Sequence, residues 1–162
     1  NIGCDADTSG LRHRGAINVD IWYRNPWTGM DCPAHLIADA RALPATLYDQ
    51  FDTVILGDIL EHFIERTDVV KVLQEATQCL KPGGEILLTC PEDDRPVSEQ
   101  VDVQGAIEAR MYCHGVLAYH AYPVTRGVIS GWLADAHLKA ETWSHISYPF
   151  CVRGGHGVVA VA

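Results

Sequence analysis

The chain has 162 residues, a length that fits a single domain with an ordinary hydrophobic core. Its 12 lysines and arginines are outnumbered by 21 aspartates and glutamates, and the resulting net charge of −9 repels phosphate backbones and anionic lipids. We therefore expect neither nucleic acid nor a membrane as a partner, and we expect a cytoplasmic protein because no secretory signal or long apolar span is visible.

The N-terminal part predicts two strands with a short crossover between them. Ile2 runs directly into Gly3, and residues 16–21 form a largely apolar segment that ends with Asp20 and Ile21. About a dozen residues separate the two, which is near the shortest length that a parallel crossover allows. Because a central strand needs about five residues, we expect native residues upstream of Asn1.

A loop, a third strand and a short helix or turn are predicted next. Residues 22–33 contain two prolines, a glycine and three aromatic residues, a composition typical of a loop. Residues 35–44 resemble a strand followed by a turn, with Asp39 and Ala40 at the end of the strand. Residues 43–50 predict a short helix or turn.

The centre of the sequence has the strand–helix–strand order of a parallel sheet. Residues 51–56 form an aliphatic strand that leads into Gly57-Asp58-Ile59-Leu60-Glu61-His62. An amphipathic helix capped by Thr67 is predicted over residues 68–80. At Lys81-Pro82-Gly83-Gly84 a cation meets the negative end of the helix, proline prevents its continuation, and the glycines can take the left-handed conformation. A buried strand follows from Glu85.

The last part of the chain predicts an irregular segment, a helix and two strands. Residues 92–122 are acidic and aromatic, with a weak helical stretch near residues 103–113, and we expect this substrate-side insert to determine specificity. Residues 125–138 are again amphipathic. Residues 139–148 and 157–161 read as strands that form a terminal antiparallel hairpin.

Together, these segments resemble a class I S-adenosylmethionine-dependent methyltransferase, and residues 1–91 look closest to the small type 11 enzymes. The resemblance implies one α/β domain over residues 1–162, with a doubly wound, mostly parallel seven-stranded sheet and an antiparallel terminal hairpin. It also implies S-adenosylmethionine as the cofactor and a small-molecule acceptor that is methylated on oxygen, nitrogen or carbon. Because the sulfonium is already an activated methyl donor, catalysis needs mainly positioning and proton removal, and the sequence does not identify the acceptor.

The resemblance assigns the cofactor site to turns at the carboxyl ends of the first four strands. Asp20 would accept the ribose hydroxyls, and its distance from Gly3 agrees with the spacing of about 20 residues in nucleotide-binding crossovers; capping the following turn is the alternative. Asp39 would accept the adenine amine, with N-capping as the alternative. Asp5 would receive the α-ammonium of the cofactor or remain a solvated turn residue. The expected cofactor-binding residues are Gly3, Cys4, Asp5, Asp20, Ile21, Asp39, Ala40, Gly57 and Asp58.

Two histidines are candidates for the catalytic proton acceptor, because imidazole titrates near neutral pH. His62 follows Glu61 in the Leu-Glu-His pattern of the family, where orienting the strand and helix is the alternative role. His120 lies in the insert, in a cluster that could line an acceptor pocket; each histidine alone could equally be a core or surface residue. The cluster comprises Tyr112, His114, Tyr119, His120 and Tyr122.

Neither a metal site nor a disulfide is expected from the sequence. The histidines show no His-x-x-x-His repeat, so we predict no bound metal; a zinc site formed by histidines of the insert with Cys113 is the alternative. The six cysteines have no Cys-x-x-Cys spacing, and several lie in apolar runs, so we predict reduced and mostly structural thiols.

Two other functions fit part of the sequence. Gly3 is followed by Asp5 and Asp7 instead of further glycines, so a non-catalytic binding or scaffold protein with a degenerate cofactor loop is the alternative function. A nicotinamide-dependent oxidoreductase would share the parallel sheet. That reading requires Gly-x-Gly-x-x-Gly, which is absent, and it does not explain the turn at residues 81–84.

Overall fold

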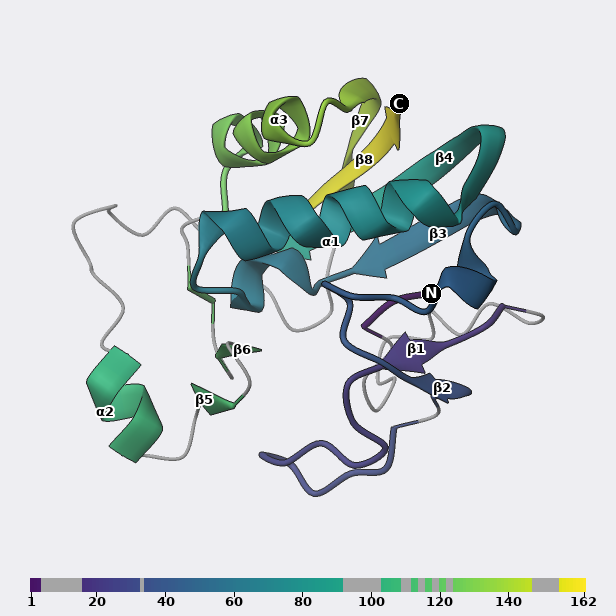
Figure 1. Ribbon diagram of the computed structural model, residues 1–162. Helices are drawn as coiled ribbons and strands as arrows, with labels where there is room; N and C mark the ends of the chain where they lie inside the picture. The colour runs from purple at the N-terminus through teal and green to yellow at the C-terminus, as the bar shows by residue number, and fades with distance from the viewer. Residues whose placement is uncertain are drawn as a thin grey trace.

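Figure 1 shows the computed structural model of the chain, which describes residues 1–3, 16–32, 34–91, 103–108, 112–113, 116–117, 120–121, 124–146 and 155–162. In chain order the strands are β1 (Val19–Asp20), β2 (Leu36–Ile37), β3 (Phe51–Gly57), β4 (Leu80–Pro91), β5 (Tyr112–Cys113), β6 (Val116–Leu117), β7 (Lys139–Ile146) and β8 (Gly155–Val161). The helices are α1 (Arg66–Cys79), α2 (Val103–Glu108) and α3 (Arg126–Asp135), with the short 3₁₀ helices η1 (Ala45–Leu47) and η2 (Leu60–His62). None of the described helices combines the length and apolarity needed to cross a bilayer.

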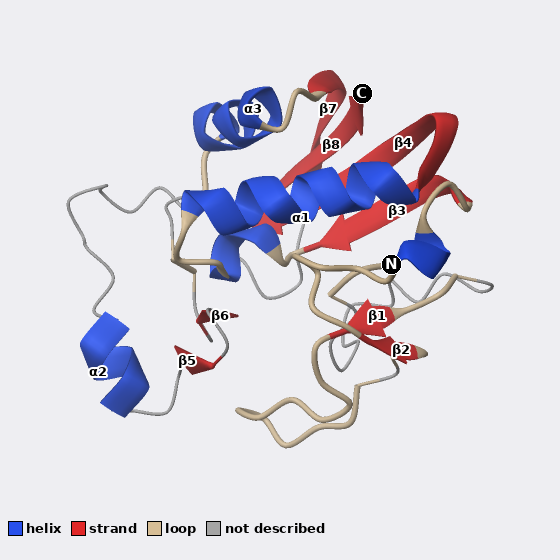
Figure 2. Ribbon diagram, in the orientation of Figure 1, coloured by secondary structure: helices blue, strands red, loops and turns tan. Residues whose placement is uncertain are grey.

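The main sheet has the strand order β3-β4-β8-β7, and β1 and β2 form a parallel pair beside it (Figure 2). Ile2 joins the two parts through parallel bridges to Val19 of β1 and Leu56 of β3. The Ile2 amide donates to the Ile55 carbonyl at 2.9 Å, and the Gly3 amide donates to the Val19 carbonyl at 2.9 Å. The predicted α/β fold is thus confirmed, but seven strands are not. In the described part of the chain, the first of the seven expected strands is represented by Ile2 alone, between β1 and β3.

The terminal hairpin forms as the sequence predicted. Strand β4 pairs with β3 in parallel, whereas β8 pairs with β4 and with β7 in antiparallel fashion. Leu88 of β4 lies opposite Val158 of β8, so apolar side chains from both strands reach the same face of the sheet. The hairpin is therefore inserted into the sheet, with β8 between β4 and β7.

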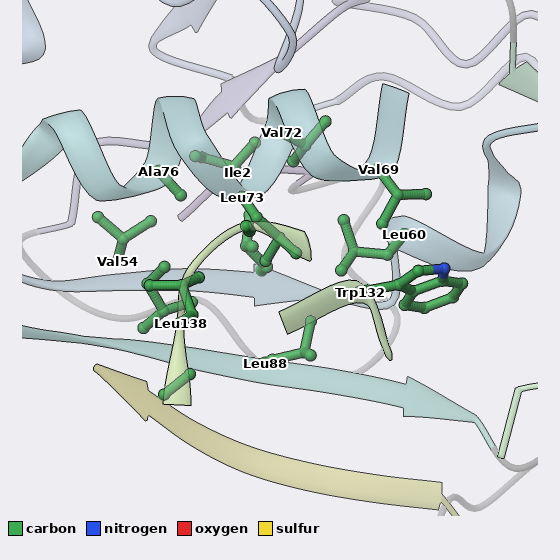
Figure 3. Packing of buried hydrophobic residues seen from close by; sticks show 14 of the residues in the cluster. Ile2, Val54, Leu60, Val69, Val72, Leu73, Ala76, Leu88, Trp132 and Leu138 are labelled. Carbon is green, nitrogen blue, oxygen red and sulfur yellow. The ribbon is translucent and has the colours of Figure 1, made fainter. Parts of the chain in front are cut away.

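Helices α1 and α3 cover one face of this sheet and enclose the core. Val54 and Leu56 of β3 alternate with more exposed neighbours, and the alternation places them against α1. Figure 3 shows Leu73 and Ala76 of α1 directed toward the strands in the same layer. Trp132 of α3 is only 2% exposed and packs in the same cluster, so burial of these side chains fixes both helices on the sheet.

The two longer helices begin in different ways. Thr125 caps α3, since its Oγ1 accepts a hydrogen bond from the Val128 amide at 3.3 Å. The predicted cap of α1 was wrong, because α1 begins at Arg66 and Thr67 lies inside it. The Arg66 guanidinium contacts the Asp135 carboxylate of α3 at 2.6 Å, an ion pair between α1 and α3 at the residue where α1 starts.

The turn after α1 differs in detail from the prediction. The helix ends at Cys79, and the chain is already extended at Leu80. Gly83 has a φ of +82°, whereas Gly84 is required for space, because a Cβ there would lie 3.0 Å from the Asp52 carbonyl oxygen. Lys81 does not act at the helix end. Its Nζ contacts both oxygens of the Asp52 carboxylate, at 2.9 and 3.0 Å.

The predicted helical stretch in the insert is shorter than expected. Helix α2 ends at Glu108, and residues 112–113 pair with residues 116–117 as the small antiparallel ladder β5-β6. Phe63 forms an antiparallel bridge to Val116, which connects this ladder to the end of η2. Part of the insert therefore packs beside residues 60–63.

Candidate functional site

A cavity of about 440 Å³ opens at the carboxyl ends of β1, β2 and β3. Ligands of doubly wound sheets bind at this edge, where the strand order reverses, and here it reverses between Ile2 and β3. The volume is in the range of small-molecule sites. The lining residues are Ile2, Gly3, Asp20, Ile21, Trp22, Asn25, Trp27, Thr28, Ala38, Asp39, Ala40, Asp58, Ile59, His62, Phe63 and Val116.

Gly3 forms the innermost turn of the cavity wall and tolerates no side chain. Its φ of +73° lies in the left-handed region, and a Cβ would lie 2.8 Å from Cδ1 and 3.0 Å from Cβ of Ile59. The Ile59 side chain therefore packs directly against the Gly3 backbone at the cavity wall. Cys4 and Asp5, which were expected to continue this turn, lie outside the described residues.

Asp20 ends β1 and faces the cavity with only 8% of its surface exposed. The Trp22 amide donates to Asp20 Oδ1 at 3.2 Å, so the side chain caps the following turn. An ionised carboxylate has about four lone-pair sites and can accept several hydrogen bonds at once. Its neighbour Ile21 also lines the cavity.

Asp39 lines the cavity but is held by Arg41. The Arg41 amide donates to Asp39 Oδ1 at 2.9 Å, the capping geometry considered as an alternative, and the Arg41 guanidinium contacts both carboxylate oxygens. Arg41 also pairs with Asp68 of α1 at 2.8 Å. The hydrogen bond to Asp39, followed by that to Asp68, raises the pKa of the Arg41 guanidinium above its ordinary value. This bridge ties the turn at Asp39 and Ala40 to the first turn of α1.

Asp58 has an unusual backbone conformation at the end of β3. Its φ is +50°, which aspartate tolerates better than most residues. The Asp58 amide donates to the Thr89 carbonyl at 3.0 Å, and Thr89 Oγ1 donates to Asp58 Oδ1 at 2.9 Å. Gly57 precedes it as the last residue of β3 and is not among the residues that line the cavity.

The two candidate catalytic histidines lie together with Glu61 at the end of the cavity bounded by η2. The rings of His62 and His120 are 5.5 Å apart in an edge-to-face arrangement. The Ala121 amide donates to the Glu61 carbonyl at 2.6 Å, and the Leu117 carbonyl contacts His62 Nδ1 at 3.0 Å. These contacts hold the insert against η2, although the contacting residues are more than fifty positions apart in the sequence. Of the remaining cluster, Tyr112 is in β5, while His114, Tyr119 and Tyr122 lie outside the described residues.

Glu61 is the most unusual charged residue of the site. It is completely buried, and neither carboxylate oxygen has a hydrogen-bond partner among the described residues. Burial, with the nearby Asp58 carboxylate, raises the pKa of Glu61 to about 8. Burial also raises the pKa of the adjacent Cys90 thiol, which faces Glu61. Cys32, Cys79, Cys90 and Cys113 are free thiols, whereas Cys4 and Cys151 lie outside the described residues.

Several cavity residues were not identified individually from the sequence, which predicted residues 22–33 only as a loop over the cofactor edge. Asn25 Oδ1 accepts from the amides of Trp27 and Thr28, at 2.9 and 3.0 Å, and thereby shapes the loop over the cavity. Trp22 and Trp27 meet edge to face, with ring centroids 5.1 Å apart. The Asn-Pro pair could have indicated the turn. Ile59 and Phe63 carry no polar signal, and only the fold brings them to the site.

The fold and the position of the cavity define the chain as a protein with the Rossmann-like fold of class I methyltransferases. Residues 14–88 match the family described as "Methyltransferase domain", which confirms the resemblance seen in the sequence. No protein of curated function matches the chain.

Three solved structures illustrate the similarity. A S-adenosylmethionine-dependent methyltransferase from Methanosarcina mazei is 14% identical with a TM-score of 0.60, covering 98% of this chain and 89% of its own. A protein from Pyrococcus horikoshii is 16% identical with a TM-score of 0.60, covering 99% and 80%. The third is 1,6-didemethyltoxoflavin-N1-methyltransferase from Burkholderia thailandensis, solved with bound 1,6-didemethyltoxoflavin and S-adenosylhomocysteine; it is 17% identical with a TM-score of 0.60, covering 88% and 59%. At these identities the likeness establishes a common fold.

Proposed function

We propose that the protein binds S-adenosylmethionine in the cavity beside Gly3 and transfers its methyl group to a small-molecule acceptor. The cofactor is supported by the methyltransferase family match and by the neighbour with bound S-adenosylhomocysteine. The observation that carries the proposal is Asp20, a buried carboxylate at the end of β1 in a cavity at the point where the strand order reverses.

The cofactor would extend along the edge of the sheet formed by Ile2, β1 and β2. Its methionine part would lie against the backbone at Gly3, where a side chain is excluded, and its ribose hydroxyls would donate to Asp20. Adenine would lie near Ala40, since Arg41 fixes the conformation of that turn. Trp22 and Trp27 offer aromatic surface at the same side of the cavity.

The acceptor would occupy the part of the cavity bounded by η2 and β6. His62 and Val116 line this part, and His120 lies against the His62 ring. An imidazole at this position could remove the proton that the acceptor loses on methylation. The neighbour from Burkholderia thailandensis is solved with a small organic acceptor, and we infer an acceptor of similar class here, methylated on oxygen, nitrogen or carbon.

Calorimetry with S-adenosylhomocysteine tests the proposal and separates it from the scaffold alternative. The wild-type protein should bind, and Asp20→Asn should bind more weakly, whereas Asp52→Asn should bind normally because Asp52 is an exposed residue of β3 outside the cavity. Absence of binding to the wild-type protein would favour the scaffold function. If the wild-type protein binds, mass spectrometry of ligands that co-purify with it would reduce the number of candidate acceptors.

A further inference from the structure

Three potential metal ligands converge beside the cavity. Glu61, His62 and His120 each offer one donor atom, and these atoms lie within 4.8 Å of one another. A tetrahedral cation with ligand bonds of about 2.1 Å separates its donors by about 3.4 Å, so small side-chain rotations would suffice to close the site. Glu61 and His62 are adjacent in η2, and His120 comes from the insert.

The Glu61 carboxylate independently indicates a missing cation. It is completely buried and lies with His62 and His120. Neither of its oxygens has a hydrogen-bond partner of ordinary geometry among the described residues, and the Cys90 thiol that faces it is a weak donor. An isolated buried carboxylate is costly, because it has lost its hydration without gaining a partner. A divalent cation would supply that partner.

His62 has the orientation of a metal ligand. Its Nδ1 lies 3.0 Å from the Leu117 carbonyl oxygen. Because a carbonyl only accepts hydrogen bonds, Nδ1 donates this one, and in the neutral ring Nε2 then carries the lone pair. Metal-bound histidines commonly donate their other ring N–H to a backbone carbonyl in this way, which fixes the tautomer and the ring plane.

We propose that Glu61, His62 and His120 bind one divalent transition-metal cation at the acceptor side of the cavity. Two imidazoles and one carboxylate favour a cation such as Zn²⁺ or Mn²⁺ over Mg²⁺, which prefers oxygen ligands. The proposal replaces the expectation from sequence that no metal is bound. Sequence could not indicate it, since 57 positions separate His120 from His62 and only the fold brings them together.

Three protein ligands leave coordination positions open toward the cavity, which His62 lines. If the proposed methyl transfer holds, an oxygen or nitrogen of the acceptor would occupy such a position. The cation would then lower the pKa of that group, which would release its proton to solvent water; the freed lone pair would take the methyl group from the sulfonium and leave S-adenosylhomocysteine. In that case the two imidazoles act as ligands and do not remove the proton themselves.

Metal titration of the whole, untagged and chelator-treated protein tests the proposal. Calorimetry with Zn²⁺ and Mn²⁺ should give one site per chain, and added cation should raise the melting temperature. Glu61→Gln and His120→Gln should each weaken binding more than about 100-fold, since loss of a direct ligand exceeds the 10- to 100-fold typical of residues that support a ligand. Glu141→Gln and His145→Gln serve as matched controls, because both residues are exposed on β7.

The outcomes are decisive in either direction. Both site variants should melt cooperatively without metal, and His120→Gln keeps the test valid if Glu61→Gln fails to fold. No stoichiometric binding to the wild-type protein, unchanged affinity in both variants, or equal affinity for Mg²⁺ would overturn the proposal. Titration of the same samples with S-adenosylhomocysteine separates the two functions, since loss of the metal leaves the Asp20 side of the cavity intact.

Discussion

Replacing Gly3 by alanine should damage the cavity far more than the same change at Gly83. Both residues have positive φ, at +73° and +82°, so both variants place a side chain in the left-handed region. Their surroundings differ. A Cβ at position 3 would lie 2.8 Å from Ile59 Cδ1, whereas nothing lies within 4 Å of a Cβ at position 83. The pair therefore separates backbone strain from steric overlap.

The magnitudes follow from these two contributions. The left-handed conformation costs an alanine about 1–2 kcal/mol at either position. Overlap with Ile59 adds about 1–3 kcal/mol at position 3, the usual cost of overpacking a filled site. We therefore expect Gly83→Ala to lower the free energy of unfolding by about 1–2 kcal/mol and Gly3→Ala by roughly 2–5 kcal/mol. Only Gly3→Ala should also weaken S-adenosylhomocysteine binding, because Gly3 lines the cavity.

Urea denaturation and calorimetry measure both effects. The double variant Gly3→Ala/Ile59→Ala should recover part of the loss, with a coupling free energy of more than about 1 kcal/mol, because the shortened side chain removes the nearest atom. Equal destabilisation by Gly3→Ala and Gly83→Ala, together with no coupling to Ile59, would refute the packing argument.

Three further changes test other parts of the structure. Asp20→Asn should weaken S-adenosylhomocysteine binding by roughly 1.5–3 kcal/mol, about 10- to 100-fold by calorimetry, because charge-assisted hydrogen bonds to the ribose are lost; unchanged affinity would remove Asp20 from the site. Arg41→Ala should lower the free energy of unfolding in urea by about 1–3 kcal/mol, since it removes the guanidinium contacts of two partly buried carboxylates, of which Asp68 keeps only the longer contact to Lys71 among its ion pairs. Arg66→Ala removes an exposed ion pair and should lower the free energy of unfolding by less than about 1 kcal/mol. Equal destabilisation by Arg41→Ala and Arg66→Ala would contradict the distinction between partly buried and exposed pairs. Deletion of residues 155–162 should yield insoluble or molten protein, because it removes an interior strand of the sheet, and a cooperative melt of the shortened chain would argue against this.

The sequence predicted the elements whose local pattern agrees with their final environment. Strand β3, helix α3 and the β7-β8 hairpin each combine a periodic apolar pattern with a clear boundary. The start of α1 was misplaced because Thr67 is a good capping residue, whereas the helix begins at the residue that pairs with Asp135 of another helix. Local sequence contains no information about such a partner.

The candidate site was predictable only where polar residues follow strands. Asp20, Asp39 and Asp58 could be placed at one edge because parallel strands align their carboxyl ends. The meeting of His120 with His62 depends on the path of the insert, which carries no regular pattern. The isolation of the Glu61 carboxylate is likewise a property of packing, and the Leu-Glu-His pattern alone does not distinguish a solvated glutamate from a buried one.

The position of β8 has a consequence for synthesis on the ribosome. This strand comes latest in the chain among the strands of the sheet, yet it lies between β4 and β7 and pairs with both. While the chain grows, β4 and β7 are translated before β8, so both lack the strand that pairs with them until residues 155–161 have been made. We therefore expect the parallel half of the sheet to collapse early and the hairpin to dock late. Nascent chains that stall before residue 155 should depend on chaperones to stay unaggregated.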